Sequence, residues 1–284
     1  RVVSRYKDAE SHYSEALFIR LDLAKRNPDA FEPDAALTLN NLATLYYGQL
    51  RYRDAETSYS NAIAIYRRLI KNNPDAFASF LALALSNRAL VYNAVQRYQE
   101  AEADYIEALA VYRELAKVNT AAFISYLALI LNNLGLLYVT TQQYKNAESC
   151  YTEALTFYRG LKEKDPEVYE PHIATLLLNL GSLYIYVQHF SNAQAIFSEG
   201  LPLIRKLAEK YPEAYEPNLA KTLNNLALLY SNTEQYKSAE ACSQEALSIY
   251  RKFTEKDPDA WESELAQALN NLALLYSYMG QHEK

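Results

Sequence analysis

The sequence predicts an all-α protein, built as a solenoid of antiparallel helix pairs. One motif recurs at a constant 46-residue step along the whole chain. Within each period, apolar residues recur at three- and four-residue spacings, which indicates amphipathic helices. Only 6 of 284 residues are glycine, and the Asn-Gly and Asp-Gly pairs of tight hairpins are absent, which disfavours an all-β fold. A constant period without insertions predicts repeats that pack on their neighbours.

A residue pair marks the start of each period. Five copies carry Pro at its second position, and Asn119-Thr120 fills the remaining place. The pairs with proline are Asn27-Pro28, Asn73-Pro74, Asp165-Pro166, Tyr211-Pro212 and Asp257-Pro258. The Asn27-Pro28 pair suits a helix start, because Asn is a favoured N-cap and Pro a favoured first residue. A second proline, found at Pro33, Pro171 and Pro217, predicts that the period's main first helix begins only after a bend.

Each period is expected to hold two helices, called A and B. In the first full copy helix A contains Ala36 to Tyr46, a polar break follows at 48–51, and helix B runs from Tyr52 to Lys71. We expect a single solenoid over 1–284, with an unpaired helix B at 5–26 and an unpaired helix A at 263–280. Full repeats are expected at about 33–72, 79–118, 125–164, 171–210 and 217–256.

Among the repeat positions that keep one kind of residue in all six copies, three carry an alanine, a tyrosine and an aromatic residue. A small residue, which lets helices approach closely, occupies Ala36, Ala82, Ala128, Ala174, Ala220 and Ala266. Tyrosine occupies Tyr46, Tyr92, Tyr138, Tyr184, Tyr230 and Tyr276. An aromatic residue, expected in the connection from B to A, occupies Phe31, Phe77, Phe123, Tyr169, Tyr215 and Trp261. Neighbouring positions vary, so packing is expected to hold these three.

The pattern Leu39-x-x-Leu42-Ala43-x-x-Tyr46, followed by Ala55-x-x-x-Tyr59, resembles the tetratricopeptide repeat. The string Leu-Asn-Asn-Leu-Ala-Leu-Leu-Tyr, at 223–230 and again at 269–276, is similar to the long-repeat, kinesin-light-chain-like subclass. The resemblance implies about 12 main helices stacked as a right-handed superhelix, with helices A lining a concave peptide-binding groove.

The repeat departs from the family pattern in its length and at the end of helix B. Its period is 46 residues, where the usual tetratricopeptide repeat has about 34. The proline that usually ends helix B is replaced by arginine at Arg67, Arg113, Arg159, Arg205 and Arg251. Without that proline helix B can run about two turns longer, which explains the longer period.

Composition and charge disfavour several functions. A net charge of −6 without a basic stripe disfavours nucleic-acid binding. No apolar run approaches the roughly 20 residues of a membrane span, so no membrane partner is expected. The four histidines are scattered, and Cys150 and Cys242 lie two periods apart, so neither a metal site nor a disulfide is predicted. With no phosphate-binding glycine loop, we expect a non-enzymatic, cytoplasmic protein without cofactors.

The candidate functional residues are asparagines of helix A. Asparagine has a low helix propensity in the middle of a helix, so helix formation does not explain why it recurs. It occupies Asn41, Asn87, Asn133, Asn179, Asn225 and Asn271, and a second asparagine precedes it at Asn40, Asn132, Asn224 and Asn270. An amide both donates and accepts hydrogen bonds, as the backbone of an extended peptide does. Alternatively, each Asn bonds a neighbouring helix and sets the superhelical pitch, and both roles are compatible.

The rest of the expected groove face is leucine-rich, with Tyr186 on it and Lys221 as its only obvious charge. Family members that clamp an acidic C-terminal tail use several Lys and Arg residues there, so the resemblance implies a neutral, partly apolar ligand. The leading hypothesis is a protein-interaction scaffold that binds a peptide segment or a partner helix. The alternatives are end-to-end self-association through the unpaired terminal helices, or the sensor or adaptor arm of a larger signalling protein.

Three features break or extend the pattern. Arg88 stands where other copies carry leucine, and a buried arginine must either extend to solvent or pair with a carboxylate. A local structural pair is expected, and a role with ligand is the alternative. Ser243 replaces the aromatic residue of Tyr59 and its counterparts, which predicts either a looser core or repacking by a neighbour. Glutamates recur on helix B at Glu56, Glu102, Glu148 and Glu240, where a solvated face is expected.

Overall fold

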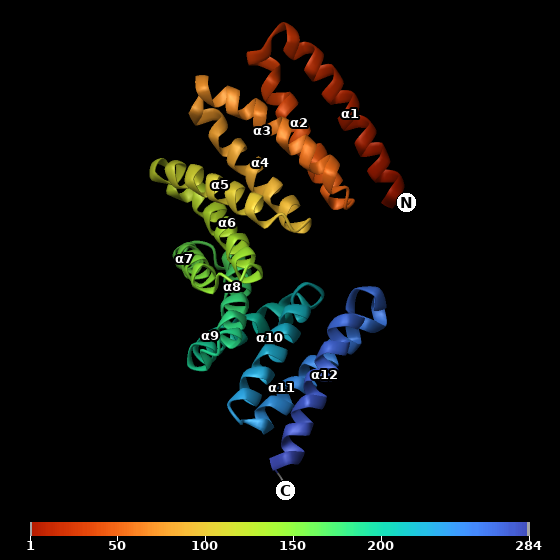
Figure 1. The fold of residues 1–284 in the computed structure, drawn as a ribbon, viewed down its shortest axis with the longest axis vertical. Coiled ribbons are helices and arrows are strands. Elements are labelled where there is room, and N and C mark those ends of the chain that lie inside the picture. Colours follow the sequence, from red (N-terminus) through yellow and green to blue (C-terminus); the bar gives the residue numbers. More distant parts are fainter. Residues whose placement is uncertain (1, 283–284) are drawn as a thin grey trace. The chain divides into compact units, whose positions relative to one another are not determined.

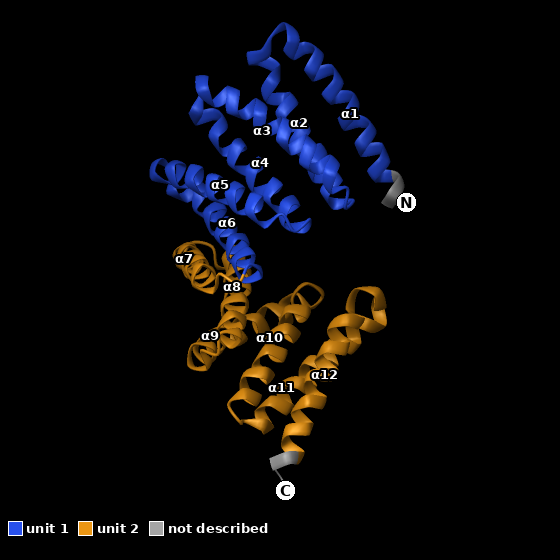
Figure 2. Cartoon of the chain, in the orientation of Figure 1, with its two compact units in different colours: residues 1–141 blue, residues 142–284 orange. Residues whose placement is uncertain are grey.

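The computed structural model describes residues 2–282, which form twelve α-helices and no strand (Figure 1). The predicted all-α architecture of paired helices is confirmed. Two compact units divide the chain, at 1–141 and 142–284 (Figure 2). The first unit holds α1 (Val2–Arg26), α2 (Pro28–Gly48), α3 (Tyr52–Asn72), α4 (Pro74–Ala94), α5 (Tyr98–Val118) and α6 (Thr120–Thr140). The second holds α7 (Tyr144–Lys162), α8 (Pro166–Tyr186), α9 (Phe190–Lys210), α10 (Pro212–Asn232), α11 (Tyr236–Lys256) and α12 (Pro258–His282).

Even-numbered helices correspond to helix A, and they begin earlier than predicted. The Asn27 side chain accepts from the Ala30 N–H at 3.4 Å, and Asn73 accepts from Ala76 at 3.2 Å, so the predicted caps are confirmed. Helix α2 starts directly after the first cap, at Pro28, and Pro33 lies inside it. Pro33 lacks the N–H that would bond the Asp29 carbonyl. Because Asp29 is exposed, water can take that place, and no separate connection forms.

The aromatic residues expected in the B-to-A connection therefore lie in the first turns of helix A. There three of them pack on an aromatic residue of the preceding helix B, namely Phe123, Tyr169 and Trp261. The ring of Trp261 lies 5.4 Å from that of Phe253, and the ring of Phe123 lies 6.0 Å from that of Tyr112. These contacts help to fix α6, α8 and α12 against the helix before each of them.

The turn from A to B contains one residue in the left-handed region at each repeat. None of these residues is glycine. They are Leu50, Gln96, Gln142, Gln188 and Glu234, with φ between 60° and 62°. The next N–H donates to the carbonyl of the recurring tyrosine, from Arg51 to Tyr46 at 2.9 Å and from His189 to Tyr184 at 2.8 Å. This geometry satisfies a carbonyl at the end of helix A, at the cost of a strained backbone.

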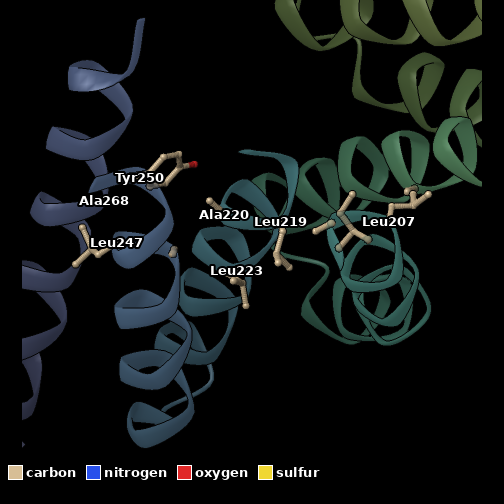
Figure 3. Packing of buried hydrophobic residues seen from close by; sticks show 11 residues of the cluster. Leu207, Leu219, Ala220, Leu223, Leu247, Tyr250 and Ala268 are labelled. Atoms are coloured by element: carbon tan, nitrogen blue, oxygen red, sulfur yellow. The ribbon is translucent and has the colours of Figure 1, made fainter. Parts of the chain in front are cut away.

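The core lies between consecutive helices and is filled by the recurring apolar residues. In the second unit, Leu219 and Leu223 of α10 pack with Leu207 of α9 and with Leu247 of α11 (Figure 3). The small residue of the repeat is buried wherever another helix covers it. Its buried members are Ala36, Ala82, Ala128, Ala174 and Ala220, whereas Ala266 on α12 is exposed.

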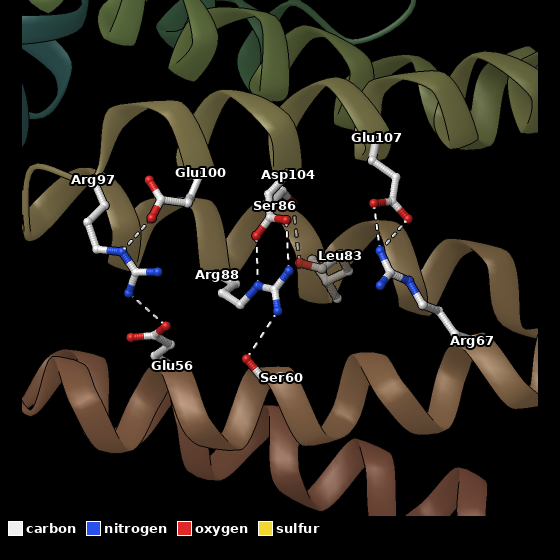
Figure 4. Close-up of polar contacts among 10 residues, drawn as sticks. All are labelled: Glu56, Ser60, Arg67, Leu83, Ser86, Arg88, Arg97, Glu100, Asp104 and Glu107. Atoms are coloured by element: carbon white, nitrogen blue, oxygen red, sulfur yellow. Dashed lines mark hydrogen bonds and ion pairs between the residues drawn. The ribbon is translucent and has the colours of Figure 1, made fainter.

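Polar contacts also recur between successive repeats. The arginine that replaces the usual proline pairs with a glutamate on the next helix B, from Arg67 to Glu107 at 2.7 Å (Figure 4) and from Arg159 to Glu199 at 2.7 Å. The glutamates expected on a solvated face are instead bonded. The recurring tyrosine donates to them, as in Tyr184 to Glu148 at 2.7 Å, and the same contact joins Tyr138 to Glu102 and Tyr276 to Glu240.

One helix departs from the expectation on membrane spans. Helix α6 is long and apolar enough to cross a membrane, by length and composition only, with a mean hydropathy of 1.8. The sequence estimate missed it because Asn132 and Asn133 interrupt the apolar run near its middle. Leu127, Leu131 and Leu134 of this helix are buried within the protein, as expected of a core helix, so its composition is weak evidence for a membrane.

Candidate functional site

The recurring asparagines of helix A occupy equivalent, half-buried places. All six are partly accessible, on α2, α4 and α6 of the first unit and on α8, α10 and α12 of the second. They are Asn41, Asn87, Asn133, Asn179, Asn225 and Asn271. Half-burial allows contact with a ligand and with a neighbouring helix alike.

The preceding asparagines are placed less uniformly. Asn132 and Asn224 are half-buried and Asn270 is exposed. Asn40 is buried, and its Oδ1 has no hydrogen-bond partner. A buried amide oxygen without a partner costs about 1–3 kcal/mol. Because it is buried, Asn40 cannot touch a ligand, and the predicted polar stripe does not extend to it.

The amides gather most closely in the second unit. A hollow of about 340 Å³ is bounded by three successive A helices, α8, α10 and α12, and by α11. It is called the amide pocket here. Its lining consists of Leu178, Asn179, Ser182, Lys221, Asn224, Asn225, Tyr250, Glu264 and Gln267. Four of the predicted site residues, Asn179, Lys221, Asn224 and Asn225, therefore share one surface.

Some of these amides already bond a neighbouring helix. Asn225 Nδ2 donates to Ser182 Oγ at 2.7 Å, which joins α10 to α8. Asn271 Nδ2 donates to Asn224 Oδ1 at 3.2 Å, which joins α12 to α10. The packing role considered for the asparagines is thus present in the second unit. Each amide carries two N–H donors and an accepting oxygen, so one such bond leaves hydrogen-bonding capacity for a ligand.

Three residues of the amide pocket were missed in the sequence. Gln267 stands one period after Lys221, so extending that position by 46 residues would have found it. Glu264 lies one turn before Gln267 on α12, and among the other copies only the first carries a charge there, at Asp34, so the position did not stand out. Tyr250 comes from helix B and reaches the pocket between two A helices, which projection along a single helix cannot show.

The charges of the amide pocket balance. Lys221 is not its only charge, because Glu264 lines the same hollow. Tyr250 adds a neutral hydroxyl, since burial raises its pKa to about 12. One positive and one negative side chain beside several neutral amides suit a ligand without net charge.

Other residues predicted for the groove lie elsewhere. Tyr186 is exposed at the end of α8, and its ring packs 5.1 Å from that of Tyr144 on α7. It does not line the amide pocket. Leu129 and Leu136 are exposed on α6 of the first unit, where an apolar ligand surface was expected.

Arg88, which replaces a leucine of the repeat in the first unit, forms an ion pair with a carboxylate. Its guanidinium forms two bonds with Asp104, of 2.7 and 2.8 Å, and a third with Ser60 at 3.0 Å (Figure 4). The local structural pair that we expected is thus confirmed. Asp104 is the counterpart of Cys150 and Cys242, which are not joined in a disulfide.

Within residues 2–282, no group of three or more His, Cys, Asp or Glu side chains is arranged to hold a metal ion. The perturbed pKa values of this part of the chain belong mainly to buried tyrosines of the core and to ion pairs. Burial raises the pKa of Tyr66 and of Tyr158 to about 12. Such shifts reflect packing, and they do not identify a nucleophile with its base.

Comparison with known proteins agrees with the repeat pattern. Models of the tetratricopeptide repeat match residues 35–75, 80–160 and 172–252. No curated protein sequence matches the chain. Members of this family are in general non-catalytic scaffolds or adaptors that bind other proteins.

Solved structures show the same fold. The chain is similar to BtubC (BKLC) from P. vanneervenii, at 23% identity and a TM-score of 0.68, over 88% of this chain and 92% of that one. It is similar to kinesin light chain repeats from Podospora anserina, at 15% identity and a TM-score of 0.55, over 78% and 98%. It also resembles PilF of Pseudomonas aeruginosa, at 18% identity and a TM-score of 0.53, over 89% and 99%. From the 46-residue period, the helix pairs and the matched models, we conclude that the chain belongs to the tetratricopeptide repeat family.

Proposed function

We propose that this protein is a non-catalytic interaction scaffold, and that the amide pocket binds an extended segment of a partner protein. The observation that carries the proposal is the meeting of Asn179, Asn224, Asn225 and Gln267 in one accessible hollow. Amides facing an extended chain can accept from its N–H groups and donate to its carbonyls. Such contacts recognise the main chain with little regard to the partner's sequence.

The partner segment is proposed to be neutral and partly apolar. Lys221 and Glu264 contribute opposite charges to the pocket lining, so a strongly acidic or basic segment would gain from one and lose to the other. Leu228 and Leu274, which are more than 40% exposed, offer apolar area on α10 and α12 beyond the pocket. We therefore expect affinity to depend weakly on salt.

Binding of the chain to an array of neutral peptides tests this function. The test variant is Asn179→Ala/Asn225→Ala, and the control is Gln194→Ala, which removes an exposed amide from α9 of the same unit. We expect the double variant to lose the peptides that the wild type captures, and the control to keep them. Unchanged capture by a folded double variant would refute the assignment to the amide pocket.

A second candidate function is self-association. Helix α1 exposes Phe18 at 76% and Ile19 at 50%, and α12 exposes Leu274 and Tyr278. Exposed apolar side chains on a helix favour contact with another protein surface, and two such helices could stack copies into a filament. Light scattering over a range of protein concentrations tests it. A mass that rises with concentration in the wild type and stays constant in Phe18→Ser/Ile19→Ser would support stacking through α1.

A further inference from the structure

The repeat places one aromatic ring of helix B between two A helices. The ring belongs to Tyr59, Tyr105, Tyr151 or Phe197, and each is at most 2% exposed. Around Tyr59, the contacts come from Ala43 on its own helix A and Val91 on the next. The Tyr59 hydroxyl also lies 2.9 Å from Thr44 Oγ1. The repeat therefore builds a site for a ring and normally fills it itself.

In the last copy this site is not filled. Ser243 stands in place of the aromatic residue, and it is buried in α11. A hollow of about 100 Å³, called the Ser243 pocket here, lies beside it between α10 and α12. Its lining consists of Ala227, Leu228, Ser231, Asn232, Ser243, Asn271, Leu274, Leu275 and Tyr278. Of the two outcomes expected from Ser243, the structure shows the looser core, since a hollow of about 100 Å³ remains beside it.

Repeat arithmetic identifies the pocket as the vacated ring site. Subtracting four periods from Ala227, Leu228 and Leu275 gives Ala43, Thr44 and Val91. These are the residues that surround the ring and hydroxyl of Tyr59. The hollow therefore has the position of an aromatic side chain between two A helices, and its walls are the ones that hold such a ring elsewhere in the chain.

The Ser243 pocket opens beside the amide pocket. Leu228, Leu274 and Tyr278 line it and are 42–48% exposed, so it is reachable from the surface. Along α12, Leu274 lies seven residues beyond Gln267 of the amide pocket, which is about 10 Å on a helix. An extended peptide covers that distance in about three residues.

We propose that the Ser243 pocket receives an aromatic side chain of the peptide held by the amide pocket, about three residues along its chain. This inference rests on the proposed function. The ligand's ring replaces the one that the repeat lacks, and the Ser231 and Ser243 hydroxyls and the Asn271 amide offer partners for a phenol group. A dry cavity of about 150 Å³ binds benzene in another protein. The Ser243 pocket is smaller, at about 100 Å³, but its edge residues are exposed, so a ring can enter it with one side toward the surface.

The test variant places an aromatic ring in the Ser243 pocket by substitution of Ser243 itself. Ser243→Tyr restores the residue that other copies carry, and Ser238→Tyr adds the same ring at an exposed position of the same helix. The probes are p-cresol and toluene, followed by NMR titration. We expect saturable binding to the wild type and to Ser238→Tyr, and binding at least about tenfold weaker to Ser243→Tyr, a loss of about 1.4 kcal/mol. Equal binding to all three proteins, or none to the wild type, would overturn the inference.

A peptide array separates this inference from the proposed function. If the captured peptides need an aromatic residue and Ser243→Tyr loses them, both are supported. If capture depends on Asn225 but neither on an aromatic residue nor on Ser243→Tyr, the Ser243 pocket is refuted and the proposed function stands. If the wild type captures no peptide, the proposed function fails and this use of the pocket fails with it.

Discussion

Arg88 Nε lies 2.7 Å from Asp104 Oδ2, and Arg88 Nη2 lies 2.8 Å from Asp104 Oδ1. This two-point ion pair joins α4 to α5 inside the first unit, with the two side chains only 15% and 8% exposed. Other copies carry leucine in place of Arg88, and the first carries Ser58 in place of Asp104. Two unusual residues of one repeat thus compensate each other, and each would be costly alone.

Breaking this pair from one side should destabilise the protein. Because either Arg88→Leu or Asp104→Ser leaves a buried charge without its partner, we expect each to lower the free energy of unfolding by about 3–5 kcal/mol. The double variant Arg88→Leu/Asp104→Ser restores the residues of other copies and should match or exceed the wild type. Urea denaturation followed by circular dichroism measures all four proteins. Losses that simply add in the double variant would contradict the compensation.

Substitution of alanine at two glycines should change the stability of the protein in opposite directions. A Cβ on Gly181 would stand 2.6 Å from Cζ of Phe197, whereas a Cβ on Gly160 would meet nothing within 4 Å. Because Phe197 is packed in the core, we expect Gly181→Ala to destabilise by about 1–3 kcal/mol through overpacking. Gly160→Ala should stabilise its helix by up to about 1 kcal/mol. Thermal unfolding of both variants checks this, and a stabilising Gly181→Ala would show that the ring moves freely.

The left-handed turn residues offer a way to stabilise the protein. Gln188 has φ of 61°, a conformation that costs a residue with a side chain about 1–2 kcal/mol and glycine almost nothing. We expect Gln188→Gly to raise the free energy of unfolding by about 1 kcal/mol, because relief of strain exceeds the added entropy of the unfolded chain. The midpoint of urea unfolding measures the change. Gln194→Gly, within the helix that follows, serves as a control and should lower the midpoint of urea unfolding.

Stability should fall in alkaline solution through the buried tyrosines of helix B. Burial raises the pKa of Tyr66, Tyr158 and Tyr250 from 10.0 to about 12. Between these values the unfolded chain loses protons that the folded chain keeps. The contribution of these tyrosines to the free energy of unfolding is therefore complete below pH 10. It is lost as the pH rises toward 12, by up to about 1.4 kcal/mol per pH unit for each tyrosine. Urea midpoints across this range should fall less steeply in Tyr66→Phe, and an equal slope would argue against this cause.

Much of the fold was predictable because it is local and repeated. The caps at Asn27 and Asn73, the helix pairs and the buried alanines follow from short patterns that recur every 46 residues. The start of α2 was wrong, because the rule that proline begins a helix does not say which of two prolines does so. Helix α2 continues through Pro33, and because Asp29 is exposed, water can bond the carbonyl that Pro33 leaves without a donor.

The candidate site was only partly predictable, because it depends on neighbours 36 to 47 residues away. Projection along helix A found Asn179 and Asn225 but missed Tyr250, which reaches the amide pocket from a helix B. The bond from Tyr184 to Glu148 joins two recurring positions that were both visible in the sequence. Their contact could not be inferred, because the rotation of one helix against the next is set by packing.

Recognition of a peptide main chain by the amide pocket is tested most directly with N-methylated peptides. Titration calorimetry would compare an array-selected peptide with forms methylated, one at a time, at the backbone nitrogens of the bound segment. We expect methylation at one or more positions to weaken binding to the wild type about tenfold, the value of one lost hydrogen bond. The same methylation should leave the residual binding to Asn179→Ala/Asn225→Ala unchanged. Equal affinity of methylated and unmethylated peptides for the wild type would contradict main-chain recognition.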